Sequence, residues 1–192
     1  MPSNLVIQRL DLPVRTARLS LRPAHVEDAD VIWRYRRLES VGRWLTQAPH
    51  SLADHRTQFD PDRLARTLVI EREGRLIGDL MLKLESPWAQ AEVEAQARDV
   101  QAELGWVLDP AHTGNGYATE AVRELMRLCF DELRLRRVVA FCFANNETSW
   151  RLMERVGMRR ELHAVRESLH RSGEWLDVFG YALLSEEWNS HV

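Results

Sequence analysis

The stretch DPAHTGNGYATEAV, Asp109–Val122, connects a short apolar segment to the most strongly patterned helix of the chain. Gly114 and Gly116 leave the backbone N–H groups uncovered by side chains at the point where that helix begins. The first N–H groups of a helix have no partner within it, and the helix dipole adds partial positive charge. This arrangement is typical of an anion site, most often for phosphate, although a tight connection without a ligand has the same pattern.

The residues that follow the two glycines argue against two well-known phosphate motifs. A P-loop has Gly-Lys-Ser/Thr at the start of its helix, whereas Tyr117 and Ala118 follow Gly116 here. A dinucleotide-binding fingerprint has a third glycine three residues after Gly116, where this chain has Thr119. An NTPase and a Rossmann-type domain are therefore poor fits.

The pattern of apolar residues on either side predicts one mixed α/β domain over residues 1–192, with a largely antiparallel sheet. Turn signals at Glu73-Gly74 and Ser172-Gly173 predict two hairpins. Arg137–Phe143 is apolar on both faces, so we expect a central strand covered on both sides. The predicted strands are Val14–Ala24, two within Thr67–Leu84, Ala102–Pro110, Arg137–Phe143 and two within Met158–Leu184. The predicted helices are His25–Leu38, Ser51–Arg66 with an interruption at Asp60-Pro61, Ala118–Cys129 and Asn145–Gly157. The segment Glu85–Val100 is predicted to be a loop or a short surface helix.

The composition of the chain limits the classes of protein to which it can belong. The 192 residues are 45% hydrophobic, which is enough for one well-buried core. With 26 basic and 29 acidic side chains, the formal net charge is -3. The sequence therefore lacks the excess of basic residues that is expected of a nucleic-acid-binding protein. No apolar run approaches the roughly 18 residues of a membrane span, and the first residues do not resemble a signal peptide. Cys129 and Cys142 are expected to be free thiols, so we predict a cytoplasmic location.

Three stretches in this order resemble the GNAT superfamily of acetyl-CoA-dependent N-acyltransferases, in the RimJ/RimL-like branch of ribosomal-protein N-terminal acetyltransferases. They are ELGWVLDPAHTGNGYATEAV, NNETSWRLMERVGMRREL and EWLDVFGYALL, and the likeness is strongest over Ala102–Glu161. The resemblance implies a three-layer fold of about seven strands and about four helices. It also implies acetyl-CoA as cosubstrate, no metal, an amine acceptor such as a protein N-terminus or a small molecule, and a homodimer.

The resemblance also implies roles for the loop and for the strand before it. The loop amides of Thr113, Gly114, Asn115, Gly116, Tyr117 and Ala118 would bind the pyrophosphate of CoA. Trp106, Val107 and Leu108 would lie along the pantetheine arm and the thioester, although from sequence alone they form an ordinary alternating strand. The broad family pattern has Gln or Arg three residues before the first glycine, and this chain has Ala111 there.

Attack of an amine on a thioester needs a neutral amine, a stabilised oxyanion and a proton for the leaving thiolate. Family members mostly transfer the acyl group directly, and the apolar surroundings of Cys142 disfavour a covalent route. The family's tyrosine acid corresponds to Met153 here. The branch instead has Asn-x-x-Ser, which implies that Asn146 holds the pantetheine arm and that Ser149 protonates or hydrogen-bonds the CoA sulfur. Both residue types are also ordinary helix caps.

Glu103 is the leading candidate for the general base, because family members often place a glutamate on this strand that acts through water. The alternative is an exposed strand carboxylate without a role. Arg151 and Arg155 are candidates for the 3′-phosphate of CoA, or for surface pairs with neighbouring glutamates. The competing bases are Glu161, His163 and Glu167.

Five aromatic residues are candidates for lining an acceptor pocket, but most tryptophans are expected in the core or in a dimer interface. Two other functions stay open at this point: a catalytically silent acyl-CoA-binding sensor or partner domain, and a nucleotide-binding module without preference for CoA. The five residues are Trp33, Tyr35, Trp44, Trp88 and Trp175.

Overall fold

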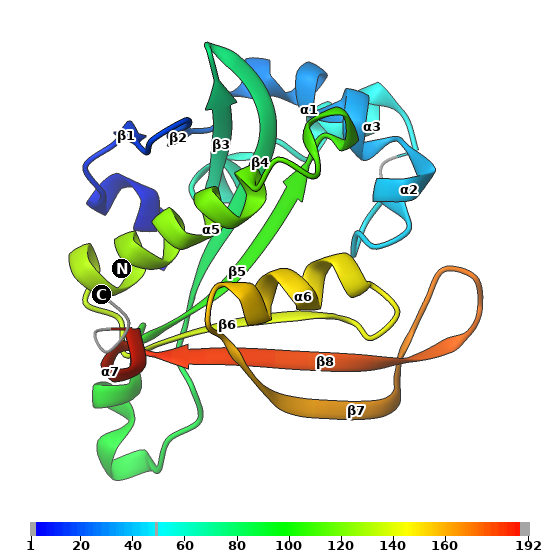
Figure 1. Cartoon of the computed structure of the whole chain (residues 1–192). Helices are drawn as coiled ribbons and strands as arrows, with labels where there is room; N and C mark the ends of the chain where they lie inside the picture. The colour runs from blue at the N-terminus through cyan, green and yellow to red at the C-terminus, as the bar shows by residue number, and fades with distance from the viewer. Residues whose placement is uncertain (1–2, 49, 189–192) are drawn as a thin grey trace. The chain divides into compact units, whose positions relative to one another are not determined.

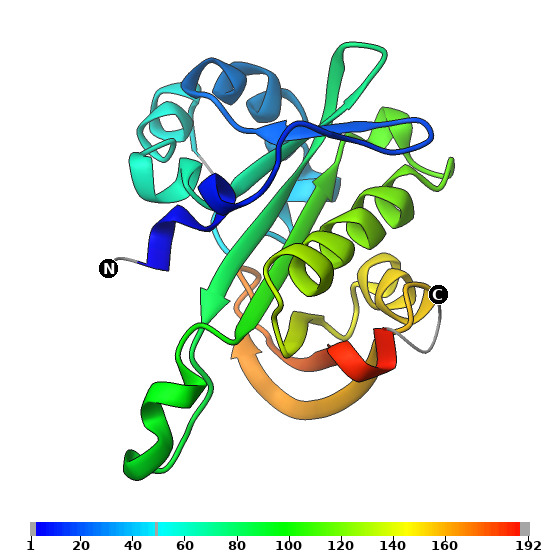
Figure 2. The ribbon, with the colours of Figure 1, turned by 90° about the vertical axis from the view of Figure 1, so that its left-hand side faces the viewer.

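A computed structural model describes residues 3–48 and 50–188, which divide into two compact units (Figures 1 and 2). Among the described residues, unit 1 consists of 3–48, 50–83 and 105–125, and unit 2 consists of 84–104 and 126–188. Three elements contribute residues to both units. They are β4 (Arg75–Glu85), β5 (Gln101–Leu108) and α5 (Tyr117–Arg127).

The strands of unit 1 before β5 are antiparallel neighbours in chain order. The predicted hairpin at Glu73-Gly74 is confirmed, and both turn residues have positive φ, 51° and 74°. Two positive φ values in a two-residue turn match the right-handed twist of the flanking strands. The strands are β1 (Val14–Arg15), β2 (Ser20–Pro23), β3 (Thr67–Arg72) and β4.

The prediction of one strand over Val14–Ala24 is wrong. The Thr16 N–H donates to the Leu19 carbonyl at 2.9 Å, and the Leu19 N–H donates to the Thr16 hydroxyl at 3.0 Å. The chain therefore reverses, and Val14 pairs with Leu21. Apolar and polar residues alternate over Arg18–Arg22, from the turn into β2, so this pattern does not mark where the strand begins.

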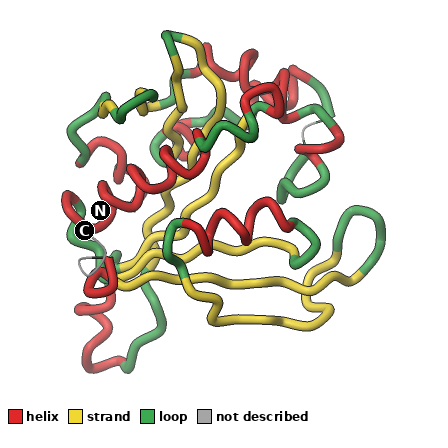
Figure 3. The backbone as a smooth tube through the Cα atoms, in the orientation of Figure 1, coloured by secondary structure: helices red, strands yellow, loops and turns green. Residues whose placement is uncertain are grey.

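The predicted N-terminal helices are divided into short segments, so the expectation of about four helices is too low (Figure 3). The break expected at Asp60-Pro61 is confirmed, because the Asp60 carboxylate accepts the Arg63 N–H at 2.7 Å and starts a new helix. The helical segments of unit 1 before α5 are η1 (Ser3–Arg9), η2 (Val26–Asp28), α1 (Ala29–Arg36), α2 (Glu39–Gly42), α3 (Leu52–Thr57), α4 (Pro61–Leu64) and η4 (Pro110–His112).

The core of unit 1 fixes the end of β5. Val107 packs against a buried cluster that includes Ile32, Phe59 and Val69. A Cβ on Gly78 would lie 2.6 Å from the Val107 carbonyl oxygen, so this approach of β4 and β5 requires glycine. Tight packing therefore holds the strand from which the loop of residues 113–118 leaves.

Two polar side chains are buried in the same unit. Asp79 is only 3% exposed; it accepts the Tyr35 hydroxyl at 2.6 Å and pairs with the Arg36 guanidinium. His55 is fully buried, and neither of its ring nitrogens has a hydrogen-bond partner among residues 3–48 and 50–188. Burial, reinforced by nearby guanidinium groups, lowers the pKa of His55 to about 4.

Unit 2 has the strand order β5-β6-β8-β7, in which β5 and β6 are parallel and the other pairs are antiparallel. Helix α6 lies over this sheet (Figure 1). The fold class, mixed α/β with mostly antiparallel strands, is confirmed. The further elements are η3 (Ala91–Ala97), a π-helical turn (Leu128–Glu132), β6 (Arg137–Phe143), α6 (Glu147–Arg155), β7 (Arg159–Leu169), β8 (Trp175–Leu184) and α7 (Ser185–Trp188).

The expectation that β6 is covered on both sides is wrong for its second half. Val138, Val139 and Ala140 are buried, whereas Phe141 is 49% exposed. Cys142 points toward α6, whose residue Ser149 acts on the pKa of its thiol. Since neighbouring strand residues point to opposite faces, Phe141 points the other way.

Strand β7 contains a bulge between Ala164 and Ser168. Arg166 in this bulge has φ 49°, and its N–H donates to Asp177 Oδ1 at 2.8 Å. The other oxygen of Asp177 contacts His163 Nε2 at 2.7 Å. The bulge thus orients a carboxylate that holds a histidine.

The segment Glu85–Val100 forms a short 3-10 helix, η3, as the sequence predicts. In Figure 2 it extends away from the strands of unit 2. None of the helices in the described ranges is long and apolar enough to cross a membrane.

Candidate functional site

The loop site, defined as residues 113–118 of unit 1, leads directly into α5. Gly114 and Gly116 both have φ 79°, a left-handed conformation that side chains other than glycine adopt at a cost. The first bond closing the helix runs from the Glu120 N–H to the Gly116 carbonyl at 3.0 Å. The N–H groups of the first turn therefore precede the intrahelical ladder, which is the geometry expected of an anion site.

Side chains brace this loop internally. The Thr113 hydroxyl donates to the Pro110 carbonyl at 2.9 Å, and the Asn115 amide donates to the Thr113 carbonyl at 3.0 Å. Asp109 accepts the Ala111 N–H at 3.0 Å and so starts η4. The Thr113 N–H also donates to the Pro110 carbonyl, at 3.3 Å. That the backbone N–H groups of the loop bind a phosphate stays a prediction.

Arg18, from the turn between β1 and β2, contacts the loop site directly. Its Nη1 donates to the Asn115 carbonyl at 2.9 Å, and its Nε donates to Glu120 Oε2 at 2.7 Å. Its guanidinium carbon lies 4.7 Å from the Tyr117 ring centroid. The Arg72 guanidinium lies 5.1 Å from the same centroid, so two cations flank the first residue of α5.

The strand before the loop, including Trp106, Val107 and Leu108, is half-buried. Val107 packs inward on the core of unit 1, so its side chain has a structural role. Whether these residues contact a thioester stays a prediction.

The α6 site, defined as Cys142, Asn146 and Ser149 of unit 2, lies where β6 leads into α6. Asn146 Oδ1 accepts the Ser149 N–H at 3.4 Å, so Asn146 is a helix cap. The Ser149 side chain lies close enough to Cys142 to act on the pKa of its thiol, which it lowers. Burial has the larger effect and raises the pKa of the Cys142 thiol to about 11, so the thiolate is scarce at neutral pH.

Two sequence expectations for α6 can be checked directly. Met153, at the place of the family's tyrosine, is 1% exposed and belongs to the core. Gly157 has φ 93°, as expected of a glycine that ends a helix.

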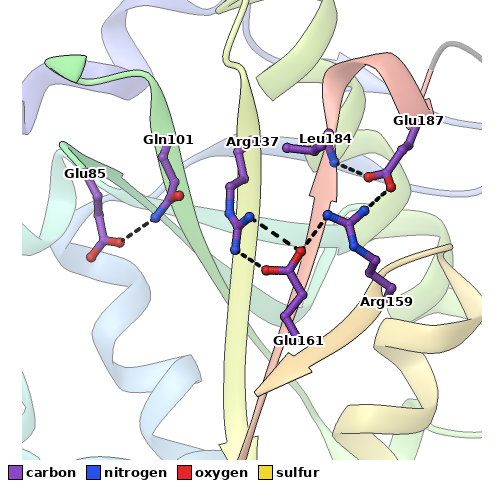
Figure 4. Close-up of polar contacts among 7 residues, drawn as sticks. All are labelled: Glu85, Gln101, Arg137, Arg159, Glu161, Leu184 and Glu187. Atoms are coloured by element: carbon purple, nitrogen blue, oxygen red, sulfur yellow. Dashed lines mark hydrogen bonds and ion pairs between the residues drawn. The ribbon is translucent and has the colours of Figure 1, made fainter. Parts of the chain in front are cut away.

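The four candidate bases have different surroundings. Glu103 is half-buried on β5, opposite Val139 of β6. Glu161 is held by Arg137 and Arg159 (Figure 4), and despite the opposing effect of burial these arginines lower its pKa. Such a carboxylate is a poor proton acceptor. The remaining two are His163, paired with Asp177, and Glu167, which accepts the Ser168 hydroxyl.

Arg151 forms an ion pair with Glu147 one turn earlier, with N and O 2.9 Å apart, and both side chains are exposed. This is the surface pair that the sequence offered as an alternative for Arg151. Arg155 lies in the last turn of α6. A role of either residue toward a phosphate stays a prediction.

The aromatic candidates are dispersed. Tyr35 is buried against Asp79, whereas Trp33 is half-buried, with its ring centroid 5.8 Å from that of His55. Trp44 lies near Arg43, while Trp88 and Trp175 are exposed. Three of the five aromatic residues belong to unit 1 and two to unit 2, and a role of any of them toward an acceptor stays a prediction.

Sequence reasoning missed Arg18, Glu120 and Asp177. Arg18 lies 97 positions from Asn115 and 102 from Glu120, and no local pattern connects them. Among the described residues, no group of three or more His, Cys, Asp or Glu side chains could hold a metal ion.

Comparison with known proteins finds an acetyltransferase family model and similar acetyltransferases. Residues 18–159 match the family model described as acetyltransferase (GNAT) domain. The chain is 26% identical over 174 residues to the uncharacterized N-acetyltransferase p20 of Bacillus licheniformis, covering 90% of this chain and 96% of that protein. In several other matches to curated N-acetyltransferases of Bacillus subtilis, the chain spans only about half the length of the relative.

Solved structures of acetyltransferases have folds similar to that of this chain. An acetyltransferase (GNAT family) from Bacillus anthracis superposes with a TM-score of 0.77 at 27% identity, covering 91% of this chain and 99% of that one. RimL, a ribosomal L7/L12 alpha-N-protein acetyltransferase, was solved in complex with coenzyme A, which forms a disulfide with one of its cysteines. It superposes with a TM-score of 0.76 at 17% identity, covering 91% of this chain and 98% of RimL.

Proposed function

Because the chain belongs to the GNAT acetyltransferase family and is an acyl-CoA-dependent N-acetyltransferase, we propose that it moves acetyl from acetyl-CoA directly to a primary amine. The acceptor is a protein N-terminus or a small-molecule amine. The observation that carries the proposal is the loop site, with two left-handed glycines at the start of α5 inside the matched region. A cytoplasmic location and a homodimer belong to the same proposal.

In this proposal, the backbone N–H groups of residues 113–118 bind the CoA pyrophosphate. The φ of 79° at Gly114 and Gly116, the start of α5 and the guanidinium of Arg18 all favour an anion there. Trp106, Val107 and Leu108 run along the pantetheine arm and the thioester. Arg151 and Arg155 are proposed for the 3′-phosphate, and for Arg151 this requires release from Glu147.

The proton for the leaving thiolate comes from Ser149, and Asn146 holds the pantetheine arm. The proximity of Ser149 to Cys142 supports this, because the hydroxyl acts on the pKa of a neighbouring sulfur. In RimL the sulfur of CoA is bonded to a cysteine, and we propose that Cys142 lies near the CoA sulfur here. The raised pKa of Cys142 supports direct transfer rather than an acyl-enzyme. Glu103 is proposed as the base, acting through water.

The proposal is tested by measuring thiol release from acetyl-CoA with a panel of amines: peptides with free N-termini, amino acids, polyamines and aminoglycosides. We expect release that depends on the acceptor, with the acetylated amine identified by mass spectrometry. In parallel, CoA at ~100 times its Kd adds roughly 2.7 kcal/mol of stability, or about 5–10 °C in Tm.

A CoA-specific shift in Tm without turnover of any amine would favour a catalytically silent acyl-CoA binder instead. The burial of Met153 where relatives carry a tyrosine is the observation that favours this second candidate. Equal shifts with NAD and ATP would contradict a CoA site altogether.

Replacing Ser149 with alanine is expected to lower kcat by about 100-fold, because the leaving thiolate loses its proton donor. The Kd of acetyl-CoA, measured by calorimetry, is expected to stay within about twofold. Thr148→Ala is the matched control, since Thr148 is exposed in the same helical turn. Equal kcat for wild type and Ser149→Ala would remove Ser149 from the mechanism.

A further inference from the structure

One carboxylate lies in the first turn of α5, close to where the proposed pyrophosphate binds. Glu120 is four residues after Gly116, and its side chain is 16% exposed. An unpaired carboxylate here would repel a pyrophosphate, because both carry negative charge and the site is partly shielded from water. The structure therefore has to neutralise Glu120 if the loop site is to bind phosphate.

Arg18 and its neighbour Thr16 bind both oxygens of this carboxylate. Glu120 Oε1 accepts the Thr16 hydroxyl at 2.6 Å and the Arg18 N–H at 2.9 Å. Glu120 Oε2 accepts from the Arg18 guanidinium, with Nε and Nη2 each 2.7 Å away. Burial works against the charged form, but these bonds lower the pKa of Glu120, so the carboxylate stays ionised and compensated.

The same guanidinium extends to the loop itself. Its third nitrogen, Nη1, donates to the Asn115 carbonyl at 2.9 Å, between the two glycines. Fixing this carbonyl fixes the peptide plane that connects Asn115 to Gly116. The planar five-donor fork of arginine allows this simultaneous contact with a carboxylate and a carbonyl, which the point charge of lysine does not reproduce.

We propose that Arg18 is a positioning residue that presets the loop site for the pyrophosphate of the acyl donor, by holding the Asn115 carbonyl and neutralising Glu120. This inference rests on the proposed function. Arg18 acts through the loop and does not touch the reacting atoms. Its effect is therefore confined to donors that carry the pyrophosphate.

The test compares two donors, acetyl-CoA and S-acetylpantetheine, which has the same thioester and lacks the phosphates. Arg18→Ala is expected to lower kcat/KM for acetyl-CoA by about 10- to 100-fold through KM, as for the loss of a charge-assisted hydrogen bond. With S-acetylpantetheine, kcat/KM is expected to stay within about twofold of wild type. A purely structural role would lower both values together.

Two further variants separate charge from geometry. The double variant Arg18→Ala, Glu120→Gln lacks the negative charge of Glu120 that the loss of Arg18 leaves uncompensated. Part of the affinity for acetyl-CoA that Arg18→Ala loses is therefore expected to return. Arg18→Lys retains the charge without the fork and is expected to be intermediate. Arg56→Ala is the matched control, because Arg56 forms an exposed bidentate pair with Asp30 elsewhere in unit 1.

Equal losses with both donors, or an unchanged KM for acetyl-CoA in Arg18→Ala, would overturn the proposal. Should Arg18→Ala not fold, the donor comparison is made with Arg18→Lys. If wild type binds CoA but acetylates no amine, the proposed function fails separately. The Kd of CoA in wild type and Arg18→Ala, measured by calorimetry, then still decides the role of Arg18.

Discussion

Asp79→Ala is expected to lower the free energy of unfolding by about 3–5 kcal/mol, since it removes one partner of a buried ion pair. Asp79 is nearly inaccessible on β4, where it accepts the Tyr35 hydroxyl and pairs with Arg36. Without the carboxylate, a guanidinium and a hydroxyl stay in the interior unpaired. The quantity to measure is the midpoint of urea unfolding at an unchanged m-value.

Asp30→Ala is the matched control, because Asp30 pairs with Arg56 in the same unit with both side chains about half exposed. Its expected cost is much smaller, because water and salt screen an exposed ion pair. Replacing Arg36 and Asp79 together by leucine is expected to cost less than Asp79→Ala alone, because no charge then stays buried. A loss below 1 kcal/mol for Asp79→Ala would show that water reaches Arg36 and that the pair is not buried in solution.

Acidification from pH 7 to pH 4 is expected to remove up to about 3 kcal/mol of stability through His55. Its pKa is near 6.5 in the unfolded chain and about 4 in the folded one, and each pKa unit corresponds to about 1.4 kcal/mol. Between these values the unfolded state binds a proton that the folded state does not. Stability is therefore fully present above pH 6.5 and is lost as the pH falls toward 4.

The experiment compares the pH dependence of unfolding in wild type and in His55→Leu, which lacks the titrating group. The difference between the two proteins is expected to develop between pH 6.5 and 4, with wild type losing more. His50→Leu is the control, because the side chain of His50 is exposed. Parallel pH profiles for wild type and His55→Leu would mean that His55 is protonated in the folded state or hydrated through an open path.

Those parts of the fold that rest on local signals could be predicted from the sequence. The hairpin at Glu73-Gly74 depends on two adjacent residues with positive φ, and the break before Pro61 depends on an Asp cap. Helix α5 follows from spacings of three and four, and Gly157 ends α6 as expected. In each case the residues that decide the conformation are neighbours in the chain.

The errors arise where long-range packing decides. Arg18–Arg22 alternates as a strand does, yet β2 begins only at Ser20, because the chain reverses between Thr16 and Leu19 and β1 pairs back on β2. Arg137–Phe143 is apolar throughout, yet Phe141 is exposed because α6 covers only the face to which Cys142 points. Periodicity reports which residues prefer burial but not which neighbour covers them.

The candidate site divides in the same way. The two glycines of the loop site and the Asn-x-x-Ser of α6 are contiguous, so sequence pointed to both. The residues that contact the candidates from a distance have no such signal: Arg18 is 97 positions from Asn115 of the loop site, and Asp177 is 14 positions from the candidate base His163. The contact between Cys142 and Ser149 requires the chain to fold from a strand into the following helix.

The bulge in β7 also has a consequence for solubility. β7 is the last strand in the order β5-β6-β8-β7, and it carries exposed Leu162, Val165 and Leu169. A regular edge strand with such side chains would offer a template for another chain to pair with. The left-handed Arg166 lies where the ladder between β7 and β8 is interrupted, and an irregular edge strand is a poorer template for such pairing.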